Sequence, residues 1–537
     1  MKKKRTNFLW WHTGIIYQVY PRSFMDTDND GVGDLRGIIR KLNYLKELGV
    51  TAIWLSPVYP SPMADFGYDI SDYRSIHPLF GTMKDFDKLL EEVHKRGLKL
   101  VMDLVPNHSS EEHPWFLESR SSRDNPKRDW YLWYDPAPGG GPPNNWLSAF
   151  GGSGWEWDEK TSQYYFHSYL REQPDLNWRN PEVKEEMYNI MRFWLDKGVD
   201  GFRVDVMWHM IKDERLRNNP PNPGFGRGMS PYFRFLPAYS VDQPEVHDIV
   251  KEMRKVTDEY DERVLIGEIY LPVSSLVTYY GSDSEEEAHL PFNFQLITLP
   301  WDAREIAAAI DQYEGALPEG AWPNWVLGNH DKHRIATRVG PRQARIAAIL
   351  LLTLRGTPTM YYGDELGMKN VFISSKRIQD PHEKNIPGLG LGRDPERTPM
   401  QWDATENAGF TGGTPWLPLG RNYRKVNVSV QMEEEGSMLQ FYKRLIKLRI
   451  AEPALHSGNF RPLEASGNLL AYIRRHEEQK WLIVLNLGSG KGSLTITEIE
   501  VRGKVELGTH PDKEAEKITN KISLRGNEGI VVRLEPA

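Results

Sequence analysis

Short apolar runs alternate with helical segments over most of the chain, and this pattern restricts the fold more than any other feature. The apolar run Val50–Leu55, for example, is followed by the helical segment Asp85–Arg96 and then by the run Leu98–Asp103. A strand, a helix and a strand in this order predict parallel pairing. Eight strands are predicted in this way: Ile15–Tyr20, Val50–Leu55, Leu98–Asp103, Gly201–Asp205, Val264–Glu268, His289–Phe294, Trp325–Gly328 and Thr359–Tyr362. Eight such units predict an α/β fold, a (β/α)8 (TIM) barrel.

Two long irregular stretches interrupt the alternation. Residues 104–174, after the third strand, are rich in proline, glycine and tryptophan, and their length is typical of an inserted domain. Residues 363–436 form a second long stretch after the eighth strand. The pattern changes to short alternating runs over residues 457–537, which predicts a C-terminal antiparallel β domain. The barrel is therefore assigned to residues 1–103 and 175–456.

The composition excludes several classes of protein. The 537 residues include no cysteine, which excludes disulfides and thiolate metal sites and is compatible with a reducing cytoplasm. The net charge of −7 favours neither nucleic acid nor an anionic membrane as a partner. The basic N-terminus resembles the start of a signal peptide, but His12 interrupts the apolar run Phe8–Trp11 that follows it. No apolar run reaches the ~18 residues of a membrane span, so a cytoplasmic protein is predicted.

Four acidic residues stand at or just after the ends of predicted strands: Asp103, Asp205, Glu268 and Asp331. The strands of such a barrel end at the face that holds the active site, so these carboxylates are expected to converge. Arg203 and Asp205 lie on the same face of their strand, because side chains alternate along a strand. A buried ion pair explains this arrangement, and so does an arginine that keeps a nucleophilic aspartate ionised. Two carboxylates that flank a bond are the catalytic groups of a glycosidase.

A short acidic loop follows the first strand. It carries Asp26, Asp28, Asp30 and Asp34 around Gly31. Acids on alternate residues can converge on a hard cation such as Ca²⁺ or Mg²⁺. The loop does not match an EF-hand, because glycine occupies the twelfth position, where that motif has a glutamate. A metal site and a solvated acidic turn both remain compatible with this loop.

Four segments, in this order, closely resemble the signature regions of the α-amylase family, glycoside hydrolase family 13. They are Asp103–His108, Gly201–Asp205, Gly267–Tyr270 and Gly328–Asp331. The segment Gln173–Asn177 resembles a mark of the oligo-1,6-glucosidase subfamily. The segment Gly392–Asp403 resembles the loop after strand eight of bacterial and insect α-glucosidases. The resemblance covers nearly the whole chain.

The resemblance implies a role for each of several residues. Asp205 is the implied nucleophile, Glu268 the implied acid/base and Asp331 a third acid that binds sugar hydroxyls, while Arg203 orients Asp205. The implied contacts of the bound glucose are His108, His330 and, stacked beneath the ring, Tyr68. The implied metal site, for structural Ca²⁺ or Mg²⁺, consists of Asp26, Asp28, Asp30, the Val32 carbonyl and Asp34.

The resemblance also implies how the substrate pocket is closed. Asp65 and Arg397 resemble a pair of residues that blocks the far end of the pocket. Arg393 could take the place of Arg397 in this pair, and Arg397 could instead form a salt bridge that only packs its loop. Phe150 and Tyr169 either line the next subsite or belong to the core. A blind pocket of this kind predicts that only a terminal glucose is released.

These implications together predict a retaining exo-α-glucosidase that acts on small-molecule α-glucosides such as maltose and isomaltose. Within the subfamily, Val206 and the segment Gln173–Asn177 favour cleavage of α-1,6 bonds. The segment Asp205–Pro221 departs from typical oligo-1,6-glucosidases, so the sequence is equally compatible with a broad α-glucosidase specificity. Two alternatives are a transglucosylase of the same family and a non-catalytic, glucosidase-like binding subunit. Such subunits have a membrane span and lose the catalytic acids, whereas this chain has Asp205, Glu268 and Asp331.

Overall fold

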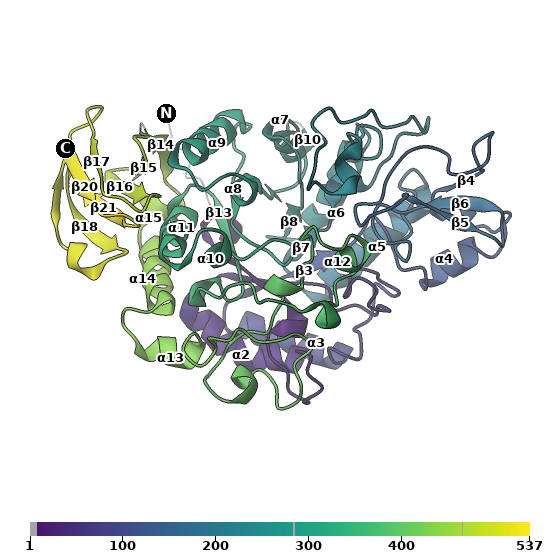
Figure 1. The fold of residues 1–537 in the computed structure, drawn as a ribbon, viewed down its shortest axis with the longest axis horizontal. Helices are drawn as coiled ribbons and strands as arrows, with labels where there is room; N and C mark the ends of the chain where they lie inside the picture. The colour runs from purple at the N-terminus through teal and green to yellow at the C-terminus, as the bar shows by residue number, and fades with distance from the viewer. Residues whose placement is uncertain (1–7, 283–284, 464, 537) are drawn as a thin grey trace.

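The computed structural model describes residues 8–282, 285–463 and 465–536 (Figure 1). Its largest sheet contains eight strands, all paired in parallel, in the order β11-β8-β7-β3-β2-β1-β13-β12. The strands are β1 (Ile16–Val19), β2 (Ala52–Leu55), β3 (Lys99–Leu104), β7 (Gly201–Val204), β8 (Val264–Gly267), β11 (Leu290–Pro291), β12 (Asn324–Val326) and β13 (Thr357–Tyr361). A parallel bridge between Asn293 and Trp325 joins the two edges of the sheet. The predicted (β/α)8 barrel is confirmed.

The sixth strand is shorter than predicted. The segment His289–Phe294 was expected to form it, but the regular part is limited to Leu290–Pro291. Pro291 has no backbone N–H, and a proline cannot donate to the ladder, which shortens a strand. The chain still follows the neighbouring strand beyond this point, since the Phe292 amide donates to the Gly267 carbonyl at 2.8 Å.

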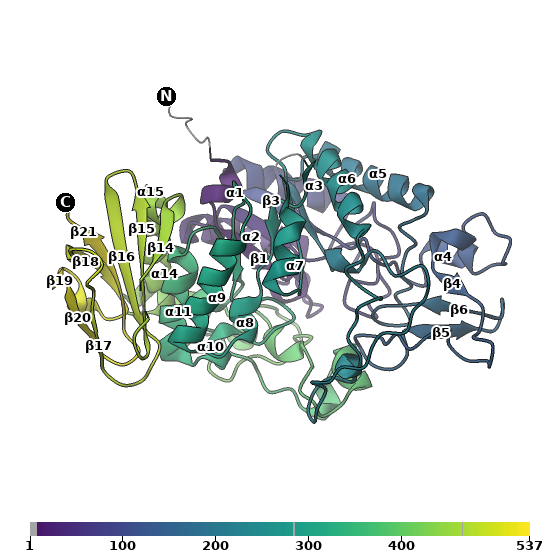
Figure 2. The ribbon, with the colours of Figure 1, turned by 90° about the horizontal axis from the view of Figure 1, so that it is seen from above.

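Helices connect the strands and surround them (Figures 1 and 2). The longer ones are α2 (Leu35–Leu48), α3 (Met83–Lys95), α5 (Pro181–Lys197), α6 (Val246–Asp258), α9 (Ala303–Ala316), α11 (Pro341–Thr353) and α14 (Met438–Ala451). Helix α5 illustrates why the sequence folds this way. The Asn180 side chain accepts from the Glu182 amide, proline occupies its first position, and Gly198, at φ 104°, ends it. Such end signals made the helices predictable.

The segment after β3 has a small sheet of its own. It contains helix α4 (Pro114–Ser119) and three antiparallel strands in the order β4-β6-β5: β4 (Trp133–Tyr134), β6 (Gln163–Phe166) and β5 (Trp155–Asp158). Its separate apolar cluster consists of Leu132, Trp146, Trp155 and Phe166. A separate core explains how so long an insertion stays ordered beside the barrel.

The C-terminal region lies at the opposite end of the molecule from this insertion (Figures 1 and 2). Its main sheet is antiparallel, in the order β14-β15-β16-β21-β18-β19: β14 (Asn459–Pro462), β15 (Leu469–His476), β16 (Gln479–Asn486), β21 (Gly529–Leu534), β18 (Arg502–Gly508) and β19 (Lys517–Thr519). A second sheet pairs β17 (Gly492–Thr495) with β20 (Lys521–Leu524). Buried Leu, Ile and Val side chains of both sheets form one core, as predicted for a β domain.

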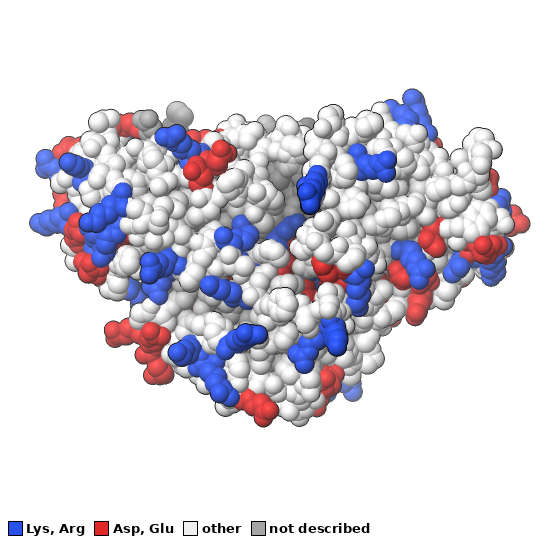
Figure 3. Space-filling model, in the orientation of Figure 1, with Lys and Arg blue, Asp and Glu red and all other residues white. Residues whose placement is uncertain are grey.

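The surface carries charges of both signs. Figure 3 shows that Lys and Arg are interspersed with Asp and Glu over the face seen in Figure 1. Among the described residues, no helix has the length and apolar character needed to cross a bilayer.

Candidate active site

A cavity of about 450 Å³ opens where the barrel strands end. Nine of the eleven residues predicted to act in catalysis or to contact substrate line it: Asp65, Tyr68, His108, Phe150, Tyr169, Asp205, Glu268, His330 and Asp331. The other two, Arg203 and Arg397, are fully buried behind this lining. Residues distant in sequence therefore meet in one place, as strand ends of a barrel do.

Arg203 lies beneath the floor of the cavity. Its Nη1 lies 2.7 Å from Asp103 Oδ1 and 2.8 Å from Asp205 Oδ1, and its Nη2 lies 2.7 Å from Glu268 Oε2. The guanidinium also lies over the Trp54 ring, 4.9 Å from the centroid. One cation thus holds three carboxylates, two of which line the cavity while Asp103 lies beneath them.

The burial of these carboxylates and their shared contact with Arg203 change the pKa values of Asp205 and Asp103. Burial raises the pKa of Asp205, and Arg203 opposes that effect. Burial likewise raises the pKa of Asp103 to about 6 against the opposing effect of Arg203. Asp103 and Asp205 therefore retain a proton more readily than isolated carboxyl groups would. A site of this kind can supply both an ionised nucleophile and a proton donor.

The backbone is strained directly after Asp205. Val206 has φ 37° and ψ 46°, a left-handed conformation that is unusual for a β-branched residue. This turn directs the Val206 amide at Glu268 Oε2, to which it donates at 2.9 Å. Strain of this type occurs at functional sites, where the surrounding structure imposes it. Glu268 is thus fixed by an amide and by Arg203.

His330 and His108 lie in the cavity wall as neutral groups. Burial places the pKa of His330 well below its usual value and lowers that of His108 to about 4. His330 Nε2 lies 2.7 Å from the Tyr68 hydroxyl, and the two rings are stacked at 5.3 Å. His108 Nε2 lies 3.1 Å from Gln173 Nε2. Neutral imidazoles can donate and accept hydrogen bonds, which suits hydroxyl groups.

Of the two arginines considered as the partner of Asp65, Arg393 makes the contact and Arg397 does not. Asp65 Oδ1 lies 2.6 Å from Arg393 Nη2, which also contacts Asp380 Oδ1 at 2.7 Å. Arg397 instead contacts Asp331 Oδ1 at 2.7 Å. The two arginines flank the short helix η8 (Asp394–Glu396), so their spacing in sequence cannot show which one reaches Asp65.

These pairs determine the charge at the far end of the cavity. Burial raises the pKa of Asp380, but Arg393 more than offsets it and holds the pKa at about 2. Burial also raises the pKa of Asp65, which Arg393 and Arg397 oppose. Burial raises the pKa of Asp331, but Arg393 and Arg397 outweigh it and hold that pKa below its ordinary value. The far end thus combines ionised carboxylates with arginines.

Phe150 and Tyr169 both belong to the cavity wall. Their rings meet at 5.4 Å, and the Arg393 guanidinium lies 4.7 Å from the Phe150 centroid. Phe150 is 6% exposed, so it packs against the protein and still presents a face to the cavity.

A buried ion pair holds the inserted segment against this site. Lys212, which follows β7, contacts Asp175 and donates to Asn107 Oδ1 at 2.7 Å. Asp175 accepts from the amide and the hydroxyl of Ser168 at 2.7 and 2.6 Å. The segment Gln173–Asn177 therefore connects the insertion to the residues around His108.

The family model described as the alpha amylase catalytic domain matches residues 18–458. This chain belongs to the α-amylase family. It is 42% identical over 517 residues to an oligo-1,6-glucosidase of Parageobacillus thermoglucosidasius, covering 89% of this chain and 90% of the relative. It is 40% identical over 556 residues to maltase A1 of Drosophila melanogaster, covering 98% and 93% of the two chains.

Solved structures of this family superpose closely. The α-glucosyl transfer enzyme XgtA has a TM-score of 0.93 at 40% identity, with 98% of this chain and 100% of that chain covered. The trehalulose synthase MutB of Pseudomonas mesoacidophila has a TM-score of 0.90 at 36% identity, with 98% and 99% covered. The α-amylase-family fold is therefore shared by proteins named for hydrolysis and by proteins named for glucosyl transfer.

Sequence reasoning missed three features of this α-amylase-family site. Asp103 was noticed at a strand end, but its contact with Arg203 was not foreseen. Asp380 lies in the long stretch after β13, where no periodic pattern or motif draws attention to it. The strained backbone of Val206 leaves no trace in the sequence. Each depends on tertiary contacts.

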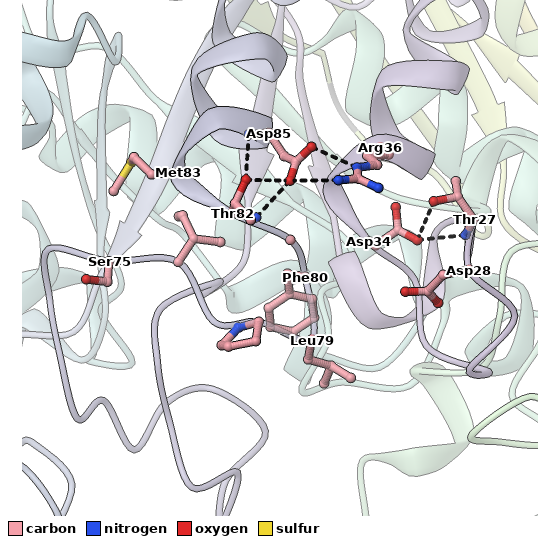
Figure 4. A pocket seen from close by; sticks show the side chains of 13 residues that line it. Thr27, Asp28, Asp34, Arg36, Ser75, Leu79, Phe80, Thr82, Met83 and Asp85 are labelled. Atoms are coloured by element: carbon pink, nitrogen blue, oxygen red, sulfur yellow. Dashed lines mark hydrogen bonds and ion pairs between the residues drawn. The ribbon is translucent and has the colours of Figure 1, made fainter.

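The acidic loop before α2 gathers three of its four predicted acids. Asp26, Asp28 and Asp34 bring ligand oxygens within 4.8 Å of one another. Asp30 is not part of this group, and its Oδ1 accepts from the Val32 amide at 2.7 Å. Carboxylate oxygens of this kind fit a hard cation such as Ca²⁺ or Mg²⁺. Figure 4 shows Asp28 and Asp34 beside a second cavity of about 490 Å³, which shares no lining residue with the catalytic one.

Proposed function

We propose that this α-amylase-family protein is an exo-α-glucosidase that cleaves short α-glucosides, such as maltose and isomaltose, with retention of configuration. The observation that carries the proposal is the bridging of Asp205 and Glu268 by Arg203 at the floor of the cavity. A retaining glycosidase needs its two carboxyl groups only about 5–5.5 Å apart, and two carboxylates on one guanidinium are close.

In the proposed reaction Asp205 attacks the anomeric carbon and forms a covalent glucosyl-enzyme. Glu268 gives its proton to the oxygen of the leaving group, and then takes a proton from the water that releases glucose. Arg203 keeps both groups in position. Asp331, His108 and His330 bind hydroxyls of the sugar ring in the cavity wall.

Release of a single terminal glucose is supported by the closed far end of the cavity. Asp65, Asp331 and Asp380 converge there on Arg393, at 2.6 to 3.3 Å. These groups are proposed to close this end to a sugar beyond the one that is cleaved. The substrate chain must then extend through the mouth of the cavity.

The preferred linkage is proposed to include α-1,6 bonds, on the strength of Val206 beside the nucleophile. Relatives named oligo-1,6-glucosidase and maltase are equally similar to this chain, which supports cleavage of both linkages.

Glucosyl transfer is the second candidate. It is favoured by the similarity to XgtA, an α-glucosyl transfer enzyme, and to a trehalulose synthase. The chemistry differs only in whether water or a sugar hydroxyl accepts glucose from Asp205.

A structural Ca²⁺, or Mg²⁺, is proposed at the loop of Asp26, Asp28 and Asp34. The cation would offset the repulsion among these acids and hold the loop before α2, remote from the chemistry. The proposed location is the cytoplasm, with which a chain without cysteine is compatible.

Proton NMR of the protein mixed with equal amounts of maltose, isomaltose and sucrose tests the proposal. Hydrolysis with retention releases α-glucose before mutarotation, and the sugar that is consumed fastest identifies the preferred linkage. If new anomeric signals from larger sugars are stronger than those of free glucose, the main reaction is glucosyl transfer and not hydrolysis. Release of β-glucose first, or no reaction with any sugar, would contradict the roles given to Asp205 and Glu268.

A further inference from the structure

A glutamine on β1 lies directly behind His330. Gln18 is fully buried and does not line the catalytic cavity. Its Nε2 lies 2.8 Å from His330 Nδ1 and donates to the Ser56 hydroxyl at 3.1 Å. The opposite edge of the imidazole faces the cavity, because His330 Nε2 lies 2.7 Å from the Tyr68 hydroxyl and 3.3 Å from Asp331 Oδ2. The ring is thus held between the glutamine on one side and the cavity on the other.

The hydrogen bonds beyond Tyr68 decide which ring nitrogen carries the proton. The Tyr68 hydroxyl donates to Asp103 Oδ2 at 3.0 Å, and the same oxygen accepts from the Trp54 indole N–H at 3.1 Å. Burial raises the pKa of Asp103 only to about 6, so this carboxylate has no proton to donate at pH 7.5. Tyr68 directs its single proton at Asp103, so its oxygen can only accept from His330. His330 Nε2 therefore carries the proton.

Asp331 leads to the same assignment. Against its burial, Arg393 and Arg397 hold the pKa of Asp331 below the ordinary value, so the carboxylate is ionised and can only accept. A bare Nε2 would place a second lone pair 3.3 Å from Asp331 Oδ2, and the two would repel each other. An N–H in this position is attracted to the carboxylate instead. Burial also keeps the pKa of His330 well below its usual value, so the ring is neutral and Nδ1 has no proton.

Gln18 completes this arrangement. A bare Nδ1 accepts a hydrogen bond, and the amide N–H of Gln18 is placed to donate one, whereas the oxygen of a reversed amide would face a lone pair. We propose that Gln18 is a positioning residue that holds His330 in the tautomer with its proton on Nε2, so that the cavity presents an N–H beside the carboxylate of Asp331. This proposal rests on the proposed α-glucosidase function and adds a residue to the site that performs it.

The tautomer determines how a sugar hydroxyl is bound. A hydroxyl group has one proton to donate and lone pairs with which to accept. It can donate to the Asp331 carboxylate and accept from His330 Nε2–H at the same time. If both wall groups were acceptors, the hydroxyl could satisfy only one of them. Gln18 thus acts on the substrate through His330, without touching it.

The other charged groups around the ring oppose a second proton on it. The further titratable and charged side chains near His330 are Tyr20, whose ring stacks on it at 5.8 Å, and the cations Arg203, Arg393 and Arg397. The cations lower the pKa of His330 further, so the ring stays neutral over the pH range of the test below.

The kinetic test is the Gln18→Glu variant, which retains the shape of the side chain and adds a titratable group. At low pH the new carboxyl group and Nδ1 hold a proton between them, and Nε2 keeps its own. As the pH rises that shared proton is lost, the carboxylate draws the remaining ring proton to Nδ1, and Nε2 becomes bare. The ratio of kcat/KM on maltose, variant over wild type, should therefore fall at least about tenfold from pH 5 to pH 8.

Gln18→Met is the matched control, because methionine fills a similar volume and cannot titrate. Its kcat/KM relative to the wild type should be lower by a constant factor of about three to ten at every pH, since one hydrogen bond is lost. A merely structural role of Gln18 predicts a constant factor for both variants. A ratio for Gln18→Glu that does not fall with pH overturns the proposal.

Neutron diffraction from deuterium-exchanged wild-type protein at pH 7.5 locates the proton without any variant or activity. Deuterium is expected on Nε2 of His330 and not on Nδ1, and deuterium on Nδ1 overturns the proposal. The same measurement separates the proposal from the proposed function. If the wild type cleaves no α-glucoside but carries deuterium on Nε2 alone, the function fails and the role of Gln18 remains. If it cleaves maltose and carries deuterium on Nδ1, the function stands and Gln18 does not have this role.

Discussion

Replacement of Arg393 by methionine is expected to destabilise the protein in a pH-dependent manner. Arg393 contacts Asp65, Asp331 and Asp380 within 3.3 Å, and Asp65 and Asp380 are 4% and 0% exposed. Methionine removes the cation and retains much of the volume. The variant therefore leaves buried carboxylates without their main partner, which is the costly way to break an ion pair.

The expected loss of stability in Arg393→Met can be derived from the pKa values of the buried carboxylates. The pKa of Asp380 is about 2, against an ordinary value of 3.8. A displacement of this size corresponds to about 2.5 kcal/mol of stability, present above pH 4 and lost as the pH falls towards 2. Without Arg393, Arg397 is left to oppose the burial of Asp65 and Asp380, which raises their pKa values. The total loss near neutral pH should then reach about 3–5 kcal/mol.

The assay is the apparent melting temperature at pH 7.5 and pH 5. Arg393→Met should melt roughly 3–10 °C lower than the wild type at pH 7.5, and the difference should shrink at pH 5, where the orphaned acids take up protons. Adding Asp380→Asn should restore part of the loss at pH 7.5. Arg377→Met, an exposed arginine in the same stretch, is the control and should melt like the wild type.

The reasoning would be refuted by a deficit that is the same at both pH values. It would also be refuted if Asp380→Asn deepened the loss at pH 7.5. Either result would mean that Arg393 acts by packing and not by charge.

Three further predictions concern the chemistry and the proposed metal. Glu268→Gln should lose at least about 100-fold in kcat/KM on maltose but far less in kcat/KM on 2,4-dinitrophenyl α-glucoside, whose leaving group needs no proton in the first step; equal losses in kcat/KM on both would exclude proton donation by Glu268. Val206→Thr should lower the isomaltose-to-maltose ratio of kcat/KM several-fold, and a ratio that stays constant would remove Val206 as a determinant of linkage. Removal of the proposed Ca²⁺ or Mg²⁺ with a chelator should lower the melting temperature, while activity at low temperature persists. An unchanged melting curve would mean that the loop of Asp26, Asp28 and Asp34 is a turn that binds no metal.

Local signals explain how much of the fold could be predicted. Helix α2 (Leu35–Leu48) is preceded by Asp34, whose side chain accepts from the Gly37 amide, and is followed by Gly49 in the left-handed conformation. Both residues act through their immediate neighbours, so the sequence is sufficient to place the helix. The shortened β11 shows the limit of such signals, because Pro291 ends a run that composition alone predicts as a full strand.

The sequence by itself determined the eight strand-and-helix units and the position of Asp205, Glu268 and Asp331 at strand ends. Periodicity and chain order contain this information, because strand ends of a barrel meet at one face whatever lies between them. Only the tertiary structure decided that Arg393 pairs with Asp65, that one guanidinium holds three carboxylates, and that Val206 is strained. It also decided that Tyr232 and Phe233, far along the chain from the catalytic acids' strands, line the same cavity. These outcomes depend on the angles at which distant loops meet, and no local pattern encodes those angles.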